Sequence, residues 1–158
     1  MSIFETSRSL WTGRMLSIYR IVAGLVFLTE GTMKLFNYPP APTPGFPAKL
    51  VSEMGAAGLI ETIGGLAIIL GLFTRPVAFI LAGEMAIAYF QVHFPQSFFP
   101  TVNGGIPPIL YCFLYLYLVF AGAGPWSIDA LIARARYGES AEIAGTRPRH
   151  AERREEAA

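Results

Sequence analysis

The sequence is poor in charged residues, and the few that it has are unevenly placed. Asp, Glu, Lys and Arg make up 15% of the 158 residues, and 53% are hydrophobic, whereas soluble domains carry roughly 25% charged residues. Six of the 12 basic residues and six of the 11 acidic residues follow Ser127, so the preceding part of the chain is apolar with isolated charges. This pattern is typical of a membrane protein, because lipid cannot solvate scattered charges.

Other absences exclude whole classes of function. A net charge of +1 provides no basic surface for nucleic acid. Cys112 is the one cysteine, which excludes an internal disulfide framework, a CxxC redox pair and the usual multi-cysteine zinc site. A cleavable signal peptide is not expected, because the first apolar segment is too long and contains Arg20, Glu30 and Lys34.

Four apolar segments follow one another, at about residues 15–36, 56–73, 77–94 and 106–122. Each approaches the roughly 20 residues that a helix needs to cross the hydrocarbon core. The connections at 38–47 and 95–108 contain five and four prolines, which do not suit a continuous helix. We therefore predict an all-α integral membrane protein, a four-helix bundle over residues 15–124.

The basic residues predict how this bundle sits in the membrane. Five arginines lie before the first segment, between the second and third, or after the fourth: Arg8, Arg14, Arg75, Arg134 and Arg136. The connections on the other side hold only Lys49 and the helix-end Lys34. By the positive-inside rule, residues 1–14, the turn at Arg75 and the C-terminus are expected in the cytoplasm (N-in/C-in).

The chain after the fourth segment is expected to be peripheral. Ser127 is well placed to cap a helix and Asp129 to favour that helix's N-terminal dipole. Apolar residues then recur at helical spacing, which predicts a short amphipathic helix over residues 125–137 on the inner membrane surface. Residues 138–158 are polar and mixed in charge, which predicts a disordered cytoplasmic tail.

Ionisable side chains inside the segments are the most informative feature, because each costs at least ~2.5 kcal/mol to insert. Arg20, Glu30 and Lys34 fall on one face of the first helix, and Glu30 and Lys34 are an i,i+4 pair. Glu61 in the second helix lies at a similar depth, and the glycines at −3, +3 and +4 from it let a neighbouring helix approach closely. We predict a polar cluster of Glu30, Lys34 and Glu61 in the outer half of the bundle, with these three as candidate catalytic groups.

Further polar residues are candidates for the lining of a binding pocket. Glu84 lies midway along the third helix, and we predict an ion pair with Arg20 in the inner half that acts mainly to hold helices together. Tyr111 and Tyr115 share a face of the fourth helix, so their hydroxyls are able to reach the acidic residues. His93 stands alone at a helix end and is interpreted as an interfacial residue; a single embedded histidine excludes a bis-histidine haem within the chain. No metal site is predicted.

Four motifs carry a family likeness: Arg20-Ile-Val-Ala-Gly24, Glu30-Gly31-Thr-Met-Lys34-Leu35, Gly58-Leu-Ile-Glu61-Thr-Ile-Gly64-Gly65 and Glu84-Met-Ala-Ile-Ala-Tyr89. With Asn103-Gly104-Gly105 further on, the chain resembles the DoxX family over about residues 14–133. The resemblance implies a four-helix protein of the bacterial inner membrane, described as an oxidoreductase or a subunit of one. Relatives include a subunit of a thiosulfate:quinone oxidoreductase. The likeness adds Asn103 to the pocket candidates.

Three functions fit these observations. The first is a membrane oxidoreductase subunit whose acidic cluster moves protons for a quinone-like molecule. The sequence shows no flavin, nicotinamide, haem or metal motif, so this function requires the quinone-like molecule or a partner subunit to carry the redox group. The second is a non-enzymatic binder or carrier of a small molecule that uses the same polar core. The third is a membrane scaffold or assembly factor, which predicts a core without a cavity. The lipid bilayer is a partner in all three, and each is compatible with a homo-oligomer. Only the first makes the chain part of an enzyme.

Overall fold

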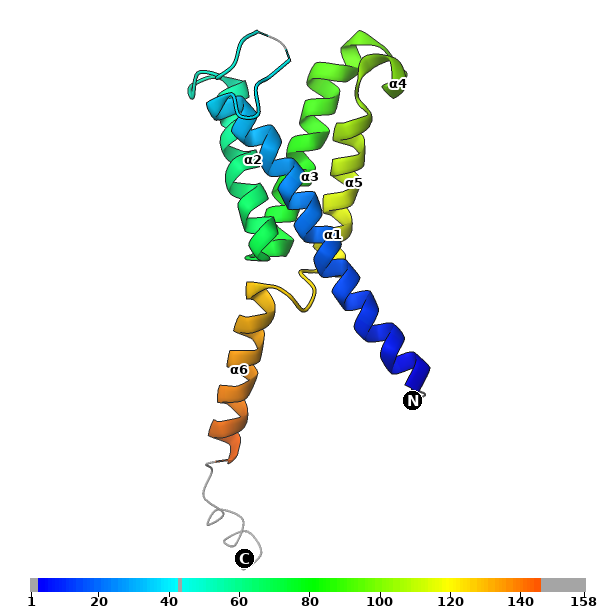
Figure 1. Ribbon diagram of the computed structural model, residues 1–158, viewed down its shortest axis with the longest axis vertical. Helices are drawn as coiled ribbons and strands as arrows, with labels where there is room; N and C mark the ends of the chain where they lie inside the picture. The colour runs from blue at the N-terminus through cyan, green and yellow to red at the C-terminus, as the bar shows by residue number, and fades with distance from the viewer. Residues whose placement is uncertain (1–2, 43, 146–158) are drawn as a thin grey trace, which may run out of the picture.

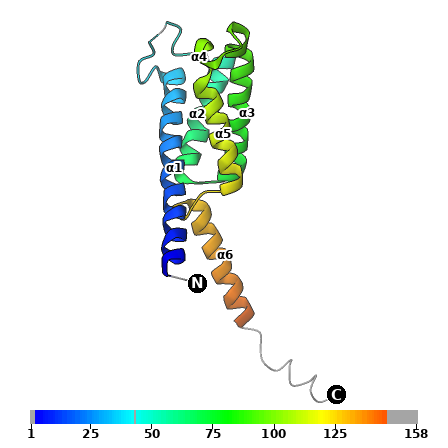
Figure 2. The same ribbon diagram turned by 90° about the vertical axis from the view of Figure 1, so that its right-hand side faces the viewer.

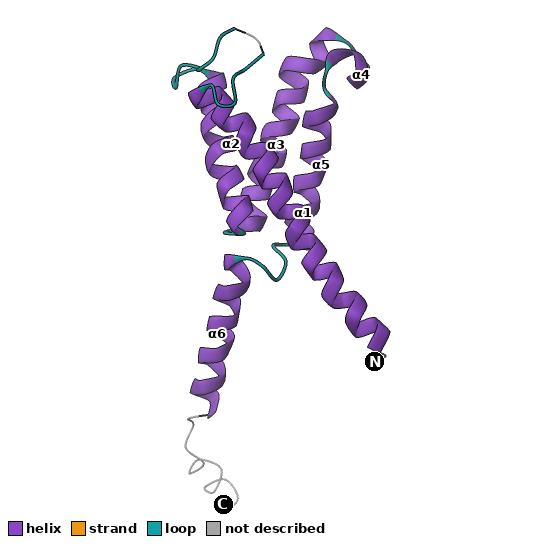
Figure 3. Ribbon diagram, in the orientation of Figure 1, coloured by secondary structure: helices purple, strands orange, loops and turns teal. Residues whose placement is uncertain are grey.

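The computed structural model describes residues 3–42 and 44–145, and within these ranges it contains helices and no strand (Figures 1 and 3). The long helices are α1 (Ile3–Phe36), α2 (Glu53–Leu70), α3 (Thr74–Ala88), α5 (Ile106–Ala121) and α6 (Ile128–Gly145). A π-helical turn at Tyr89–His93 and a 3₁₀ turn at Phe94–Gln96 extend α3, and the short α4 (Pro100–Asn103) precedes α5. The predicted all-helical class is confirmed.

The helices α1, α2, α3 and α5 lie side by side as a bundle (Figures 1 and 2). The closest packing is between α1 and α2 and between α3 and α5, and α2 and α3 join these two pairs. The start of α1 and the whole of α6 project from the same end of the bundle, which is called the α6 end below (Figure 2). At the opposite end, the proline-rich connection after α1 folds back so that the Ala48 amide donates to the Lys34 carbonyl at 2.8 Å.

Three helical stretches are long and apolar enough to cross a membrane: Trp11–Phe36, Glu53–Leu70 and Thr74–Gln96. The fourth apolar helix, α5, has 16 residues and packs along α3. Large apolar side chains cover the outside of the bundle, as Phe79, Phe113 and Phe120 illustrate. An apolar exterior around buried polar groups is the arrangement expected of a protein surrounded by lipid.

The helix boundaries differ from the predicted ones at several ends. α1 begins at Ile3 instead of residue 15, because a polar stretch can continue a helix past the point where hydropathy marks the span. α2 begins at Glu53, where the Ser52 side chain accepts from the Gly55 amide at 3.1 Å, and it stops at Gly71 with a φ of 65°. The disordered tail was predicted to begin at Gly138, whereas α6 continues to Gly145. The rest of that predicted tail, residues 146–158, lies outside the described residues.

Glycines allow α1 and α2 to pack backbone against backbone. A Cβ placed on Gly31 would lie 2.5 Å from the Thr62 amide nitrogen, and one on Gly65 would lie 3.0 Å from the Leu28 amide nitrogen. Gly64 faces the other neighbour, because a Cβ there would lie 2.6 Å from the Leu81 side chain of α3. The predicted close approach of helices around Glu61 is therefore confirmed, on both sides of α2.

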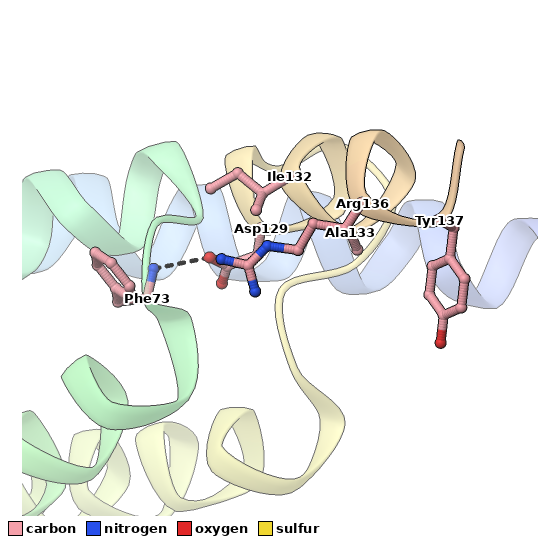
Figure 4. A pocket seen from close by; sticks show the side chains of 6 residues that line it. All are labelled: Phe73, Asp129, Ile132, Ala133, Arg136 and Tyr137. Atoms are coloured by element: carbon pink, nitrogen blue, oxygen red, sulfur yellow. Dashed lines mark hydrogen bonds between the residues drawn. The ribbon is translucent and has the colours of Figure 1, made fainter. Parts of the chain in front are cut away.

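The first turn of α6 is attached to the turn between α2 and α3. Ser127 caps α6 as predicted, accepting from the Ala130 amide at 3.1 Å. The Asp129 carboxylate also reaches the start of α3: it accepts from the Phe73 amide at 2.9 Å (Figure 4). It accepts from the Thr74 amide at 2.9 Å as well. This contact holds Phe73 at a φ of 47°, a value that is uncommon for a residue with a side chain.

Beyond this attachment α6 extends away from the bundle along the long axis of the molecule (Figures 1 and 2), not across its end as the predicted surface helix would. Residues 131–137 are exposed. A hollow of ≈ 580 Å³ lies between the start of α3 and α6, lined by Phe73, Asp129, Ile132, Ala133, Arg136 and Tyr137 (Figure 4).

Candidate functional site

A buried ion pair joins α1 to α2. The Lys34 ammonium donates to Oε1 of Glu61, and the two side chains are 16% and 1% exposed. Gly58 makes room for the lysine, because a Cβ on Gly58 would lie 3.0 Å from the Lys34 Cβ. The predicted contact between Lys34 and Glu61 is therefore present, and both side chains are largely removed from solvent.

The second carboxylate at this site comes from α3. Both Glu84 oxygens and Oε2 of Glu61 are buried without a hydrogen-bond partner, as is the Tyr115 hydroxyl. Glu84 is close enough for its charge to interact with those of Glu61 and Lys34, and the Tyr115 hydroxyl interacts electrostatically with both glutamates. Four helices thus contribute to one polar centre.

Glu30 and Tyr111 lie at the edge of this centre. Glu30 is partly exposed, and it interacts electrostatically with Glu61 and Tyr111. The rings of Tyr111 and Tyr115 stack with their centroids 6.1 Å apart, and Phe27 of α1 packs against both, at 5.2 and 5.1 Å. The following residues are called the central cluster: Glu30, Lys34, Glu61, Glu84, Tyr111 and Tyr115.

An apolar groove between α1 and α5 reaches the central cluster from the outside. Its volume is ≈ 550 Å³. Tyr111 belongs both to its wall and to the cluster. The groove is lined by Met15, Ile18, Tyr19, Val22, Ala23, Val26, Ile106, Pro107, Leu110, Tyr111 and Leu114. The exposed lining is almost entirely apolar, and Tyr19 and Tyr111 are the two lining residues that carry a hydroxyl.

The predicted ion pair between Arg20 and Glu84 is wrong. The buried Arg20 guanidinium donates to four backbone carbonyls at the α6 end: those of Ile68, Ile69 at 2.6 Å, Ala123 at 2.8 Å and Trp126 at 2.6 Å. The last carbonyls of a helix lack intrahelical partners and carry the negative end of its dipole. Arg20 therefore satisfies the end of α2 and the segment after α5, and it is not part of the central cluster.

His93 and Asn103 also lie away from the cluster, in the connection at the far end from α6. The His93 Nδ1 atom is 2.9 Å from the Asn103 carbonyl oxygen. The Asn103 side chain donates to the Ser97 carbonyl at 2.7 Å and accepts from the Gly105 amide at 2.7 Å. Both residues organise this connection. Among the described residues no group of His, Cys, Asp and Glu is arranged to hold a metal ion.

The sequence did not reveal the roles of two residues, Phe27 at the site and Asp129 at the attachment of α6. Phe27 closes the space behind both tyrosines, yet it is one apolar residue within an apolar span and carries no distinguishing signal. Asp129 was assigned to its own helix, although it is the only aspartate in the chain, which could have directed attention to a specific acceptor role.

The fold and the central cluster define a small helical membrane protein with an acidic interior. A model of the DoxX family matches residues 15–94. An uncharacterised protein of Haemophilus influenzae is 44% identical over 117 residues, which cover 72% of this chain and 87% of that protein. An uncharacterised membrane protein of Mycobacterium tuberculosis is 26% identical over 131 residues, covering 73% of this chain and 79% of that protein. The chain belongs to the DoxX family. No solved structure matches it significantly.

Proposed function

We propose that this protein is the membrane subunit of an oxidoreductase complex in the bacterial inner membrane, and that its central cluster exchanges protons with a quinone-like lipophilic molecule. The observation that carries this proposal is the state of Glu61. One of its oxygens binds Lys34, the other is buried without a partner, and Tyr111 connects the site to an apolar groove. Such a carboxylate is able to accept and release a proton without contact with bulk water.

The residues present fit a lipophilic ring with carbonyl oxygens. Ligand sites of this kind combine an apolar wall with a few placed polar groups, and the groove between α1 and α5 has an apolar wall with two tyrosines, Tyr19 and Tyr111, among its lining residues. Bound there, such a molecule would supply two-electron redox chemistry, with electrons delivered by a partner subunit. The chain itself would orient the ring, exclude water and hold protons on Glu61 and its neighbours.

The proposal includes four spans with both termini in the cytoplasm. α5 has 16 residues, or about 24 Å of helix at 1.5 Å per residue, and it packs along α3, which is extended to Gln96. The start of α1 and α6 leave the bundle at one end (Figure 2). Three arginines belong to the elements at that end: Arg14 in the first part of α1, Arg75 at the start of α3 and Arg134 in α6. Basic residues are expected on the cytoplasmic side.

Reporter fusions test this orientation. Fusions after Gly138 and at Arg75 are expected to report a cytoplasmic position, and fusions at Pro44 and Ser97 an external one. Paired reporters that are active on opposite sides of the membrane provide the control at each position. An external signal at Gly138 would contradict the four-span arrangement.

A non-enzymatic binder or carrier is the second candidate function, because the same groove could hold its ligand. Identification of the bound molecules distinguishes it from an oxidoreductase subunit. The protein is purified in mild detergent, and co-purifying lipophilic molecules and subunits are identified by mass spectrometry. A quinone-like molecule together with quinone-dependent turnover supports the proposal. A bound molecule without turnover, in the presence of every co-purifying subunit, indicates a carrier. A preparation with no bound molecule and no turnover indicates a scaffold.

Glu61→Gln is expected to abolish quinone-dependent turnover while the protein still inserts and folds. Glutamine keeps the size of the side chain and removes the exchangeable charge, so a group that passes protons loses its function; general acid–base groups contribute roughly 10²–10⁴-fold to rate. Turnover of the purified complex is the measurement. Glu53→Gln, on the exposed first turn of the same helix, is the matched control. A folded Glu61→Gln protein with full turnover would show that Glu61 carries no proton.

A further inference from the structure

The charges of the central cluster do not balance. Three carboxylates, Glu30, Glu61 and Glu84, share one cation, Lys34, and that cation is bound to Glu61. Glu30 is partly exposed, whereas both Glu84 oxygens are buried and without a hydrogen-bond partner. Of the three carboxylates, Glu84 is therefore the one whose oxygens have neither a contacting cation nor solvent.

We propose that Glu84 is a resident carboxylic acid in the folded protein and serves as the proton reserve of the central cluster. The proposal concerns the same site as the proposed function, but it rests on the burial and charge count alone and requires no redox reaction. When Glu84 gives up its proton, its O–H bond breaks and the proton passes to the unpartnered Oε2 of Glu61, so the charge of the cluster is unchanged.

Among the described residues no cation contacts Glu84, and Arg14, in the first part of α1, lies over the Trp11 ring. Arg20 donates to four backbone carbonyls at the α6 end. Arg75 is exposed at that same end and donates to the Val119 carbonyl at 3.2 Å, and Lys49 lies exposed in the connection between α1 and α2. An ionised carboxylate without a partner is strongly disfavoured in a span, and this cost disappears when the carboxylate binds a proton.

The groups around Glu84 suit a carboxylic acid. α2 contributes Glu61 with its unpartnered oxygen, and α5 contributes the buried Tyr115 hydroxyl, which also lacks a partner. From α1, Glu30 and Lys34 complete the set of ionisable groups, with Tyr111 beside Tyr115. A protonated carboxyl has one donor and remaining acceptor capacity, so it is able to match an acceptor on one side and a hydroxyl on the other, directly or through water.

Infrared spectroscopy of the purified protein tests this assignment. The wild-type protein is expected to show the C=O band of a protonated carboxylic acid, which shifts when H₂O is replaced by D₂O. Glu84→Gln is expected to lose this band, and Glu84→Asp to keep a protonated-acid band at an altered frequency. Glu53→Gln, which changes an exposed glutamate, should leave the band unchanged. ¹³C labelling of glutamate identifies the band as a glutamic acid.

Thermal unfolding gives a second readout. If Glu84 is neutral, glutamine mimics it closely, and Glu84→Gln should unfold at about the wild-type temperature. Absence of the band from the wild-type protein, its persistence in Glu84→Gln, or its failure to shift in D₂O would each overturn the proposal. None of these outcomes depends on quinone turnover, so failure of the proposed function and failure of this inference remain distinguishable.

Discussion

Arg20→Met is expected to lower the free energy of unfolding by about 3–5 kcal/mol, because a buried acceptor that loses its donor costs about 1–3 kcal/mol and several lose the same donor. The guanidinium donates to carbonyls from the end of α2 and from the segment after α5. Methionine fills much of the same volume but donates nothing, so these buried acceptors lose their partner. Arg20→Lys should be intermediate, because an ammonium is a compact charge without the planar fork of donors.

The measurement is unfolding of the purified protein by SDS titration in mixed micelles. Arg14→Met is the control, since Arg14 is exposed and its guanidinium lies 5.3 Å from the Trp11 ring centroid; loss of that contact should cost no more than about 1 kcal/mol. An unfolding curve for Arg20→Met that coincides with the wild-type curve would show that the carbonyls at the α6 end find other partners.

Lys34→Met is expected to destabilise the bundle by a similar amount, about 3–5 kcal/mol, because it leaves Glu61 buried without its cation. Glu61 is 1% exposed, so water cannot replace the ammonium without a rearrangement of α1 and α2. The double variant Lys34→Met/Glu61→Gln should recover most of the loss, because the glutamine carries no charge that needs neutralising.

The same SDS titrations on both single variants and the double variant give the coupling free energy of the pair, which for contacting groups is about 0.5–3 kcal/mol. Lys49→Met, in the exposed connection before α2, is the matched control for removing a lysine. Equal losses in Lys34→Met with and without Glu61→Gln would contradict a stabilising pair and reduce the site to independent contacts.

The variants assign different roles to the buried polar residues. Arg20 binds only backbone carbonyls, so its loss should appear as instability. Glu84 has no partner to lose, so its replacement by glutamine should appear in the infrared spectrum and not in the stability. Glu61 contributes to both properties, because one of its oxygens binds Lys34 and the other is unpartnered. These differences allow structural and protonic contributions within one small bundle to be measured separately.

Much of the candidate site followed from spacing along single helices. Glu30 and Lys34 are one turn apart, so helix geometry places them on one face in any fold that keeps the helix. The glycines around Glu61 predicted close approach, and the structure places Lys34 beside Gly58. Such predictions succeed because they need only local periodicity and one neighbouring helix.

The positions of Arg20, Glu84 and Asp129 could not be obtained in this way. The prediction paired Arg20 with an opposite charge, but its partners are carbonyl oxygens from two separate parts of the chain, and every residue carries a carbonyl. Asp129 was assigned to the dipole of its own helix, yet it also accepts from amides at the start of α3. A sequence does not mark which helix end a distant side chain will reach.

The sequence by itself determined that this chain is an all-helical membrane protein of the DoxX family with ionisable groups in its spans, because hydropathy, helical spacing and the glycine pattern are local properties. Only the tertiary structure decided which of those groups share a centre. Packing of α1 against α2 and α3 against α5 brought Glu84 and Tyr115 to the Lys34–Glu61 pair, whereas Arg20 binds the carbonyls at the end of α2 instead. Buried polar groups find partners wherever the fold leaves unpaired donors and acceptors, and that distribution exists only once the helices are assembled.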